Sequence, residues 1–530
     1  MAFGMSTLKR NLVSAVALGV ALAGPSAAQS SEVTLRSADG TVNLVGDFIE
    51  FSNNNYVIRT GLGDLRISAS RVRCEGAACP DFNDTQADVV MAGSDTVGDG
   101  VMPLLLSGYA AFLDAEVTQT ATGASGQFLA EMIGEQGFGD PMGSYLVSSS
   151  GSSDAFQSLL NGEAQIGMSA RRILPPEARA LRDDGAGNMI STSQEHIIAV
   201  DSLVVITHPA NPVRSITLEE LRDIYNGTIT NWAELGGADA PITVFSRQAD
   251  SGTKSVFDTG VFGDSAPTLP AGARIATDNT EMAALVNADE AAIGFVGYAF
   301  QRGASALTLV NDCGLSMTPD AFSARTEEYG LQRFLYLYTR DDTQDQSTTD
   351  FVRYAASEQA DEVIAKAGFI DLGVDRRAQP LDGDRARQLL DPTVDAYEGG
   401  IMREMLSQMV DYDRLSTTFR FRTGSQNLDP RGRLNLARLA DYLEAQPDGT
   451  QVLFVGFTDD VGAFDSNRQL SFGRAEQVMA ELQNFAGDRL SGIAMASTGY
   501  GEIAPTACNT SDNERRINRR VEVWIQSPNG

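Results

Sequence analysis

The chain has 530 residues, and its 70 Asp and Glu outnumber its 40 Lys and Arg to give a formal net charge of −30. At roughly 100–200 residues per domain, this length indicates about two to four domains with proper cores. The acidic excess argues against nucleic acid as a partner, because negative charge repels a phosphate backbone. With only two His and four Cys, we also expect no metal and no cofactor.

The first 28 residues are typical of a secretory signal peptide. Lys9 and Arg10 provide a positive start, and an apolar run of 13 residues follows at 12–24. Small residues precede a cleavage point that we expect after Ala28. The apolar run is too short to span a bilayer permanently. The sequence therefore predicts an exported protein.

The four cysteines fall into two pairs of different spacing. In an oxidising compartment Cys74 and Cys79 close a short loop, and we expect them to form a disulfide. Cys313 and Cys508 lie far apart in the sequence. Two arrangements stay open for them, a bridge between two domains or two separate buried thiols.

Residues 31–84 carry short alternating apolar runs, such as 56–58 and 65–67, separated by turn residues. Alternation of this kind predicts a small β module. The sequence assigns no function to it.

From 87 to 374, strand-like runs alternate with amphipathic helical runs. One helix is predicted after Thr217 and Glu220, which form a capping-box pattern, and it ends at Gly227. This alternation predicts an α/β domain with helices on both faces of a sheet.

A charged, Asp-rich connector is expected over 375–414, followed by a last domain over 415–527. In that domain Leu436, Leu439, Ala440 and Leu443 recur at helical spacing, between strand-like runs. The segment predicts an α+β domain.

Small hydroxyl residues or glycine lie at several expected helix starts and strand ends of the α/β domain. Free N–H groups and the positive end of the helix dipole make helix starts local anion sites, and hydroxyls add donors. Arg247, four residues before Ser251, adds a planar guanidinium that matches an oxyanion. The candidate anion-binding residues are Thr96, Ser152, Ser169, Arg247, Ser251, Gly252 and Thr253. The alternative at each start is a helix cap without a ligand.

These residues resemble the pattern of the periplasmic phosphate-binding components of ABC transporters, over about 87–372. In that family a Thr follows the first strand, a Gly-Ser-Ser opens the next helix, and an Arg precedes Ser-Gly-Thr, as happens here at Thr96, 151–153 and 247–253. The stretch IYNGTITNW at 224–232 is similar to a further family signature. The resemblance implies a two-lobed periplasmic-binding-protein domain for phosphate or a similar oxyanion, and it raises an ABC permease as a further partner.

One position departs from the family pattern. Phosphate-specific members place an Asp 18 residues after the ligand Ser, where it accepts the proton of HPO4 and rejects sulfate, but the equivalent residue here is Ala170. Arg171 follows it, and it either favours more highly charged oxyanions at the site or is a surface charge. Asp95, Asp154 and Asp250 are alternative proton acceptors or helix caps. The sequence leaves the identity of the oxyanion open.

The last domain resembles OmpA-like peptidoglycan-binding domains over its whole length. The resemblance rests on GFTD at 456–459, LSFGRA at 470–475 and NRRVE at 518–522. It implies that Asp459 and Arg474 bind the free amino-acid end of diaminopimelate in a stem peptide, because a carboxylate takes the ammonium and a guanidinium takes the carboxylate.

Asn467 is expected to add a hydrogen bond to that site. The alternative is that Asp459 caps the helix and pairs with Arg474 as a structural salt bridge. We expect a structural role for Arg519.

The leading hypothesis is a non-enzymatic oxyanion-binding protein of the periplasm, associated through peptidoglycan with the cell wall or outer membrane. The alternative is a structural envelope protein whose middle domain no longer binds an anion. An enzyme is the third reading, but His196 and His208 are the only imidazoles and no nucleophile–base pair is evident.

Overall fold

The computed structural model divides into two compact units, Met1–Asn83 and Asp84–Gly530. The residues that it describes are 31–36, 43–52, 55–61, 63–68, 72–76, 78–79, 87–137, 139–249, 251–263, 265, 267–342, 345–390, 396–421, 428 and 430–526. The expected signal peptide, 1–28, and Asp250 lie outside these ranges. Within them, each helix is too short or too polar to cross a membrane.

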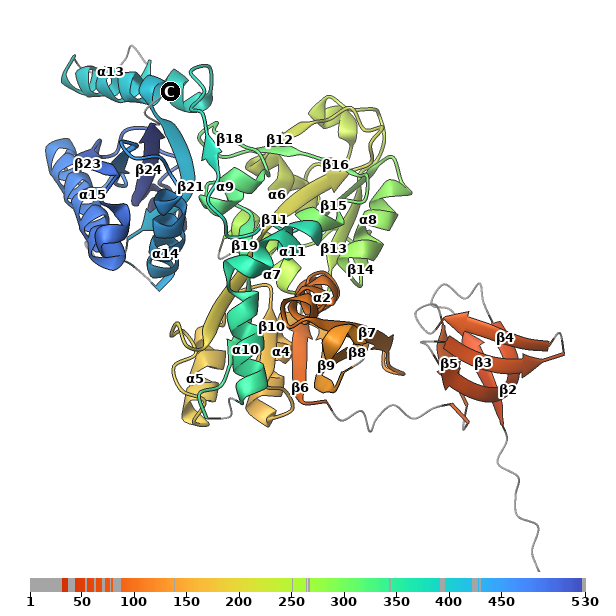
Figure 1. Cartoon of the computed structure of the whole chain (residues 1–530). Coiled ribbons are helices and arrows are strands. Elements are labelled where there is room, and N and C mark those ends of the chain that lie inside the picture. Colours follow the sequence, from red (N-terminus) through yellow and green to blue (C-terminus); the bar gives the residue numbers. More distant parts are fainter. Residues whose placement is uncertain are drawn as a thin grey trace, which may run out of the picture. The chain divides into compact units, whose positions relative to one another are not determined.

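The first unit is a five-stranded antiparallel sheet (Figure 1). The strand order is β4-β3-β2-β1-β5. The bounds are β1 Glu32–Arg36, β2 Asn43–Ser52, β3 Asn55–Thr60, β4 Gly63–Ser68 and β5 Arg73–Glu75. Alternate residues such as Val33, Leu35 and Ile58 are buried, and Cys74 is bonded to Cys79. The predicted β module and its disulfide are confirmed.

The second unit is built on a long mixed sheet that runs through two lobes (Figure 1). Its order is β14-β13-β15-β11-β19-β10-β6-β9-β8-β7. Strands of the first lobe are β6 Val89–Ser94, β7 Ala115–Ala121, β8 Gln127–Ile133, β9 Pro141–Ser150 and β10 Ile166–Ser169. Strands of the second lobe are β13 Thr243–Arg247, β14 Arg274–Ala276, β15 Ala292–Gly297 and β16 Ser305–Ala306. The antiparallel pair β11 (Glu195–Thr207) and β19 (Gln332–Thr339) joins the two lobes, so the predicted two-lobed α/β architecture is confirmed.

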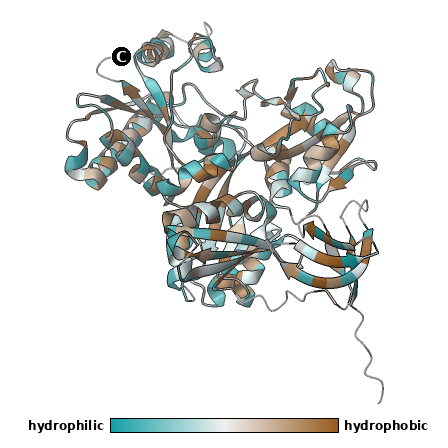
Figure 2. Ribbon diagram, turned by 45° about the vertical axis from the view of Figure 1, so that its right-hand side comes forward, coloured by the Kyte–Doolittle hydropathy of each residue, from teal (hydrophilic) through white to brown (hydrophobic). Residues whose placement is uncertain are grey.

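Helices cover both lobes of this sheet. Those of the first lobe are α1 Asp95–Gly98, α2 Met102–Phe112, α3 Gly134–Gly137, α4 Ser152–Asn161, α5 Pro175–Asp183, α10 Gln346–Ala355 and α11 Asp361–Lys366. Those of the second lobe are α6 Leu218–Asn226, α7 Gly252–Phe262 and α8 Asn279–Asn287. The hydrophobic residues gather on the strands beneath these helices (Figure 2).

The capping box predicted at the start of α6 is present. Glu220 donates its backbone N–H to Thr217 Oγ1 at 3.1 Å, and Thr217 N–H donates to Glu220 Oε2 at 2.8 Å. Gly227 ends the helix with a left-handed φ of 77°. Nearby, β12 (Ser215–Thr217), β17 (Thr308–Val310) and β18 (Ser316–Met317) form a small separate sheet.

The C-terminal domain is an α+β domain with the sheet order β20-β21-β24-β22-β23. Its strands are β20 Arg376–Arg377, β21 Asp413–Arg420, β22 Gln451–Gly456, β23 Ala494–Gly499 and β24 Arg520–Gln526. Its helices are α12 Asp384–Leu389, α13 Ala396–Asp411, α14 Pro430–Glu444, α15 Phe464–Ala486 and α16 Asp512–Asn518. The predicted helical stripe of α14 packs into one core of this domain.

The connector expected over 375–414 is a folded part of this domain, which corrects the sequence interpretation. β20 pairs with β21. In α13, Ile401, Met405 and Met409 recur every four residues and pack in a core with Val455 and Trp524. The charged residues of the segment concealed this apolar stripe.

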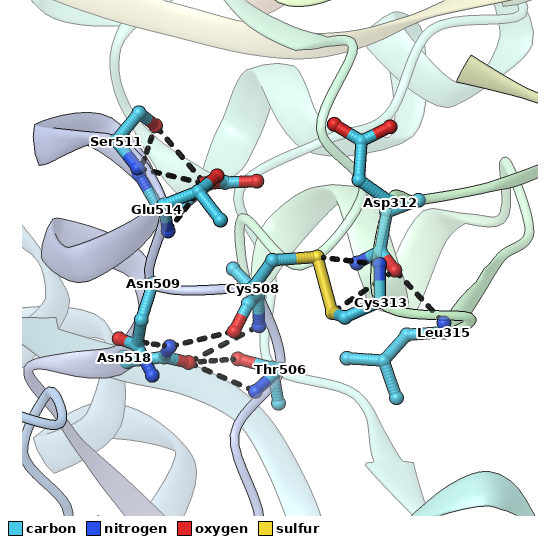
Figure 3. Close-up of a disulfide and its surroundings, with 12 residues drawn as sticks. Asp312, Cys313, Leu315, Thr506, Cys508, Asn509, Ser511, Glu514 and Asn518 are labelled. Atoms are coloured by element: carbon cyan, nitrogen blue, oxygen red, sulfur yellow. Dashed lines mark hydrogen bonds between the residues drawn. A yellow bond between two sulfur atoms is a disulfide. The ribbon is translucent and has the colours of Figure 1, made fainter. Parts of the chain in front are cut away.

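A disulfide joins the C-terminal domain to the second lobe (Figure 3). Cys313 lies in the turn between β17 and β18, and Cys508 lies between β23 and α16. Beside the disulfide, Asn518 accepts from the backbone N–H groups of Thr506 and Ala507 at 2.9 and 3.1 Å. Of the two arrangements left open by the sequence, the structure has the bridge between domains.

Candidate functional site

The candidate anion site lies where strands end. β6, β9 and β10 are parallel neighbours, so their carboxyl ends share one edge of the sheet, which is where α/β sheets bind ligands. Thr96 follows β6, and Ser152 follows β9. In the second lobe Arg247 is the last residue of β13, and Ser251 caps α7.

The N-termini of α4 and α7, one from each lobe, approach each other closely. A Cβ atom on Gly252 would lie 2.4 Å from Ser152 Oγ and 3.4 Å from the Cβ of Ala170. A side chain at position 252 would require Ser152 Oγ to move, so glycine suits this close approach. Ser152 Oγ accepts the backbone N–H of Ala170 at 3.0 Å. Two helix N-termini therefore direct their free N–H groups and dipoles toward one region, which favours an anion.

Arg247 is buried in the same region, with 3% of its surface exposed. Its Nη2 donates to Asp95 Oδ2 at 2.9 Å and to the carbonyl oxygen of Thr277 at 3.1 Å. Its Nε and Nη1 are buried without a hydrogen-bond partner in the described part of the chain. An unsatisfied buried donor is costly, so these two nitrogens mark a place for an acceptor.

Two threonine hydroxyls meet there around a second arginine. Arg333 Nη1 donates to Thr253 Oγ1 at 2.8 Å, and Arg333 Nη2 donates to Thr96 Oγ1 at 3.3 Å. Asn279 Nδ2 also donates to Thr96 Oγ1, at 3.2 Å. Because Arg333 supplies a donor to Thr253 Oγ1, that hydroxyl keeps its own proton for another acceptor.

Arg333 is held by a buried ion pair with Asp201. The Nη2–Oδ2 distance is 2.8 Å, and both side chains are almost wholly inaccessible. Burial raises the pKa of Asp201, although Arg333 and the backbone N–H of Tyr298 oppose this effect. The pair lies on the strands β11 and β19 that join the lobes, so it fixes the threonine contacts at the junction.

Two candidates do not join this arrangement. Arg171 forms a two-point ion pair with Glu177, at 2.9 and 2.6 Å, and donates to Ser153 Oγ. Ser169 Oγ donates to the carbonyl oxygen of Arg171 at 2.7 Å and so closes a local turn. Arg171 is therefore held by Glu177 of α5 and Ser153 of α4, and its contact with an anion stays a prediction.

Asp95 and Asp154, two of the carboxylates considered as proton acceptors, have different surroundings. Asp95 Oδ1 accepts the backbone N–H of Thr96 at 2.7 Å while its Oδ2 pairs with Arg247, so this carboxylate borders the site. Asp154 instead accepts the backbone N–H of Gly151 at 3.4 Å as part of the α4 cap.

A second candidate site lies in the C-terminal domain. Asp459 follows β22 and is 8% exposed. Its Oδ2 accepts from Arg519 Nη1 at 2.6 Å, which gives Arg519 the structural role expected for it. Asn467 Nδ2 donates to the carbonyl oxygen of Asp459 at 3.4 Å and to the carboxylate of Glu502.

Arg474 is also buried at this place. Its guanidinium carbon lies 5.2 Å from the ring centre of Phe421. Burial and the nearby Arg519 lower the pKa of Arg474 to about 10, while Asp459 opposes the shift. Asp459 and Arg474 are thus close enough to interact electrostatically, yet the salt bridge of Asp459 is made with Arg519.

Sequence reasoning missed Arg333 and Asn279. Arg333 places a charge directly before the apolar run 334–338. A charge in a buried strand needs partners, and this is the one feature of the sequence that could have indicated a role for Arg333. Asn279 follows Asp278, the N-cap of α8, and its type alone predicts only a cap. Within the described ranges no cluster of His, Cys, Asp or Glu is suited to a metal ion.

Two parts of the chain are similar to known protein families. The PBP superfamily domain matches residues 83–359, and the OmpA family matches residues 420–519. The phosphate-binding protein PstS of Borreliella burgdorferi is 26% identical over 232 residues, which cover 42% of this chain and 77% of that protein. Its Bacillus subtilis namesake is 27% identical over 240 residues, or 44% and 73% of the two chains.

Outer membrane porin F of Pseudomonas aeruginosa is 37% identical over 93 residues, which are 18% of this chain and 26% of the porin. Among solved structures, a putative phosphate ABC transporter substrate-binding protein with bound phosphate from Clostridium perfringens has 27% identity and a TM-score of 0.42. The match covers 53% of this chain and 98% of the Clostridium perfringens chain.

Proposed function

Because the chain belongs to the PBP superfamily, we propose that it is an exported binding protein for phosphate or a related oxyanion, held at peptidoglycan by its OmpA family domain. Relatives over residues of the first domain are named phosphate-binding proteins. A relative of the second domain is an outer membrane porin. This combination supports a periplasmic or envelope-associated location and a binding role rather than catalysis.

The observation that carries oxyanion binding is the guanidinium of Arg247. Its Nε and Nη1 are buried and have no partner in the described chain. They lie in the region where the N-termini of α4 and α7 converge and Thr253 has a hydroxyl proton to donate. Fixed donors of three kinds from two lobes match the oxygens of a tetrahedral anion.

Among oxyanions, the position of Asp95 favours the binding of phosphate over the binding of sulfate. Its carboxylate is held beside Arg247, and an ionised carboxylate repels an anion unless that anion brings a proton to share. HPO4 and its arsenate analogue carry such a proton, whereas sulfate does not at neutral pH. Asp95 thus takes the place of the family Asp that is absent at Ala170.

Calorimetry with phosphate, arsenate, sulfate and molybdate tests the proposal. We expect phosphate and arsenate to bind, and Arg247→Ala to abolish the heat while the circular dichroism stays unchanged. Arg274→Ala is a matched control, because Arg274 lies on the adjacent strand and stacks on Phe245 at 4.9 Å. If the wild type gave no heat of binding with any of the four anions, oxyanion binding would be refuted and the wall contact would remain as the function.

The proposed wall contact is the site around Asp459 and Arg474. Asp459 offers a carboxylate to an ammonium, and Arg474 offers a guanidinium to a carboxylate, so the two together select a zwitterion such as diaminopimelate. Arg474→Ala and Asp459→Ala should each release the protein from purified peptidoglycan in a pull-down. Asp488→Ala, at an exposed position of the same domain, should not. Retention of both site variants would refute the assignment.

An ABC permease is the partner that would receive the anion in this proposal. Confinement near the wall would raise the local concentration of the binding protein around envelope partners. Co-purification of a permease with the phosphate-loaded protein, and its absence with Arg247→Ala, would support this step.

A further inference from the structure

Arg333 and Asp201 face each other on the two strands that join the lobes. They are directly opposite residues in the antiparallel pair of β19 and β11. The next residue of β11, Ser202, makes its last pairing with β19, and from Leu203 onward β11 pairs with β15 of the second lobe instead. The ion pair therefore lies where the sheet passes from one lobe to the other.

The carboxylate of Asp201 fixes the orientation of the guanidinium. Its Oδ2 accepts from Arg333 Nε at 3.0 Å and from Nη2 at 2.8 Å, and its Oδ1 accepts the backbone N–H of Tyr298 at 3.0 Å. The carboxylate is also enclosed, because a Cβ atom on Gly297 would lie 2.6 Å from its Oδ2. A buried and fully bonded network of this kind is rigid. The edge of the guanidinium that carries Nη1 and Nη2 is therefore held in one direction.

That edge contacts one threonine hydroxyl from each lobe. Arg333 Nη2 donates to Thr96 Oγ1 of the first lobe at 3.3 Å, and Nη1 donates to Thr253 Oγ1 of the second lobe at 2.8 Å. Both threonines are buried. A guanidinium has five N–H groups, and the four hydrogen bonds of Arg333 to Asp201 and the threonines use four of them. One side chain of the junction thus links both lobes at the candidate anion site.

The direction of these hydrogen bonds decides what the hydroxyls can do. A hydroxyl has one proton to donate and two lone pairs that accept. Arg333 and Asn279 both donate to Thr96 Oγ1, so both of its lone pairs are occupied. The hydroxyl of Thr96 donates to Asp95 Oδ1 at 3.4 Å, which is long for such a bond. Arg333 is a donor to Thr253 Oγ1 as well, so each hydroxyl acts toward a ligand as a donor, which suits an anion.

Arg333 supplies geometry rather than surplus charge. Its own charge is balanced by Asp201, just as the charge of Arg247 is balanced by Asp95. The planar fork of an arginine can hold a carboxylate on one edge and two hydroxyls on the next, whereas the ammonium of a lysine is a point charge without that shape. The contacts of Arg333 therefore depend on its being arginine and not only on its being positive.

We propose that Arg333 is a positioning residue for the anion, which acts through Thr96 and Thr253 by directing one hydroxyl proton from each lobe toward the ligand. The inference rests on the proposed oxyanion binding and adds to it a residue of the lobe junction. Because both hydroxyls depend on one guanidinium, the two lobes present these donors together only while both contact Arg333.

Arg333→Lys tests the role of the fork while keeping the positive charge. Calorimetry of the full-length protein with inorganic phosphate should show binding weaker by on the order of tenfold. Arg340→Lys is the matched control and should bind as the wild type does. Arg340 follows β19 directly, is 7% exposed, and pairs with Asp184 and Asp342. Equal affinity of Arg333→Lys and the wild type would overturn the proposal.

A second variant removes the ion pair without leaving a buried charge unpaired. Asp201→Asn/Arg333→Gln takes away both charges together, which avoids the destabilisation caused by removing one partner alone. Melting temperatures show whether each variant is folded. The shorter glutamine does not reach both threonines, so phosphate binding should weaken as in Arg333→Lys. Wild-type affinity in this folded double variant would also overturn the proposal.

Double-mutant cycles separate positioning from a purely structural role. If Arg333 acts through a threonine, Arg333→Lys should weaken phosphate binding less in Thr96→Val or Thr253→Val than in the wild type, because the hydroxyl that it positions is gone. A residue that only supports the fold would lower the affinity by the same factor in each background. Additive losses in both cycles, in a protein that binds phosphate, would therefore overturn the role of Arg333 alone. Failure of the wild type to bind phosphate, arsenate, sulfate or molybdate would refute the proposed oxyanion function itself, and the role of Arg333 with it.

Discussion

Arg247 and Asp95 are 152 positions apart in the chain, and Nη2 of the arginine donates to Oδ2 of the aspartate at 2.9 Å across the two lobes. The pair has two consequences. It leaves two of the three guanidinium nitrogens without a hydrogen-bond partner in the described part of the chain, and in the proposed anion site it places a carboxylate beside the ligand.

Asp95→Asn should therefore change selectivity more than affinity. An amide at this position repels no anion and can donate to sulfate, so we expect the preference for phosphate over sulfate to fall by about tenfold or more, equivalent to about 1.4 kcal/mol. Calorimetric dissociation constants for both anions measure the ratio. Asp183→Asn, at an exposed carboxylate beside Arg182, is the matched control. An unchanged ratio in Asp95→Asn would show that another group selects the anion.

Moving the carboxylate to the family position provides a second test. Ala170 is fully buried, and its Cβ lies 3.4 Å from the position of a Cβ on Gly252. Ala170→Asp should sharpen the phosphate preference while weakening all anions, since two carboxylates then border one site. The double variant Asp95→Asn/Ala170→Asp should recover discrimination that Asp95→Asn loses. No change in the ratio for either protein would mean that position 170 does not face the anion.

The sequence indicated the separate parts of the proposed anion site but not their contacts with one another. Thr96, Ser152 and Thr253 could be named as candidates because strand ends and helix starts are local patterns. The sequence could not choose Asp95 among the three candidate proton acceptors, because the distance between a carboxylate and Arg247 depends on the tertiary structure. Arg333 acts from a strand outside every motif, and only packing of β19 against β11 brings it to the two threonines.

Arg171 shows the opposite case. Its place beside Ala170 suggested a ligand contact, but Glu177 lies six positions along at the start of α5, close enough to take both ends of the guanidinium. The connector over 375–414 was misjudged for a related reason. Its apolar residues are spaced every four positions in α13, but charged neighbours lower the average hydropathy of the segment.

The Cys313–Cys508 disulfide should stabilise the second unit strongly. It joins residues 195 positions apart, and in the loop-entropy model cross-linking a loop of this length destabilises the unfolded chain by about 5 kcal/mol. Cys313→Ser/Cys508→Ser should lower the urea midpoint followed by fluorescence of Trp232 and Trp524, which lie in the second lobe and the C-terminal domain. Cys74→Ser/Cys79→Ser, in the other unit, should leave that midpoint in place. Equal midpoints for all three proteins would contradict the stabilisation.

His196 should make the folded protein sensitive to mild acid. Burial lowers its pKa to about 4, with a smaller opposing effect of the backbone of Ser193. Below about pH 6.5 an unfolded His binds a proton that the folded His does not take until about pH 4. The free energy of unfolding should thus be unaffected above pH 6.5 and fall by about 3 kcal/mol as the pH drops to 4.

His196→Gln should remove that dependence between pH 6.5 and 4, while His208→Gln retains it because His196 is still present. Acid sensitivity due to Glu327 belongs to a lower window. Burial alone would raise its pKa, but nearby arginines lower it to about 2, so the stability that it contributes is complete above about pH 4.5 and is lost only as the pH falls toward 2. Urea denaturation at pH 7.5, 5, 4 and about 2.5 separates the two groups, because only the lowest pH lies in the window of Glu327. A slope between pH 7.5 and 5 that is identical in wild type and His196→Gln would assign the sensitivity to a group other than His196.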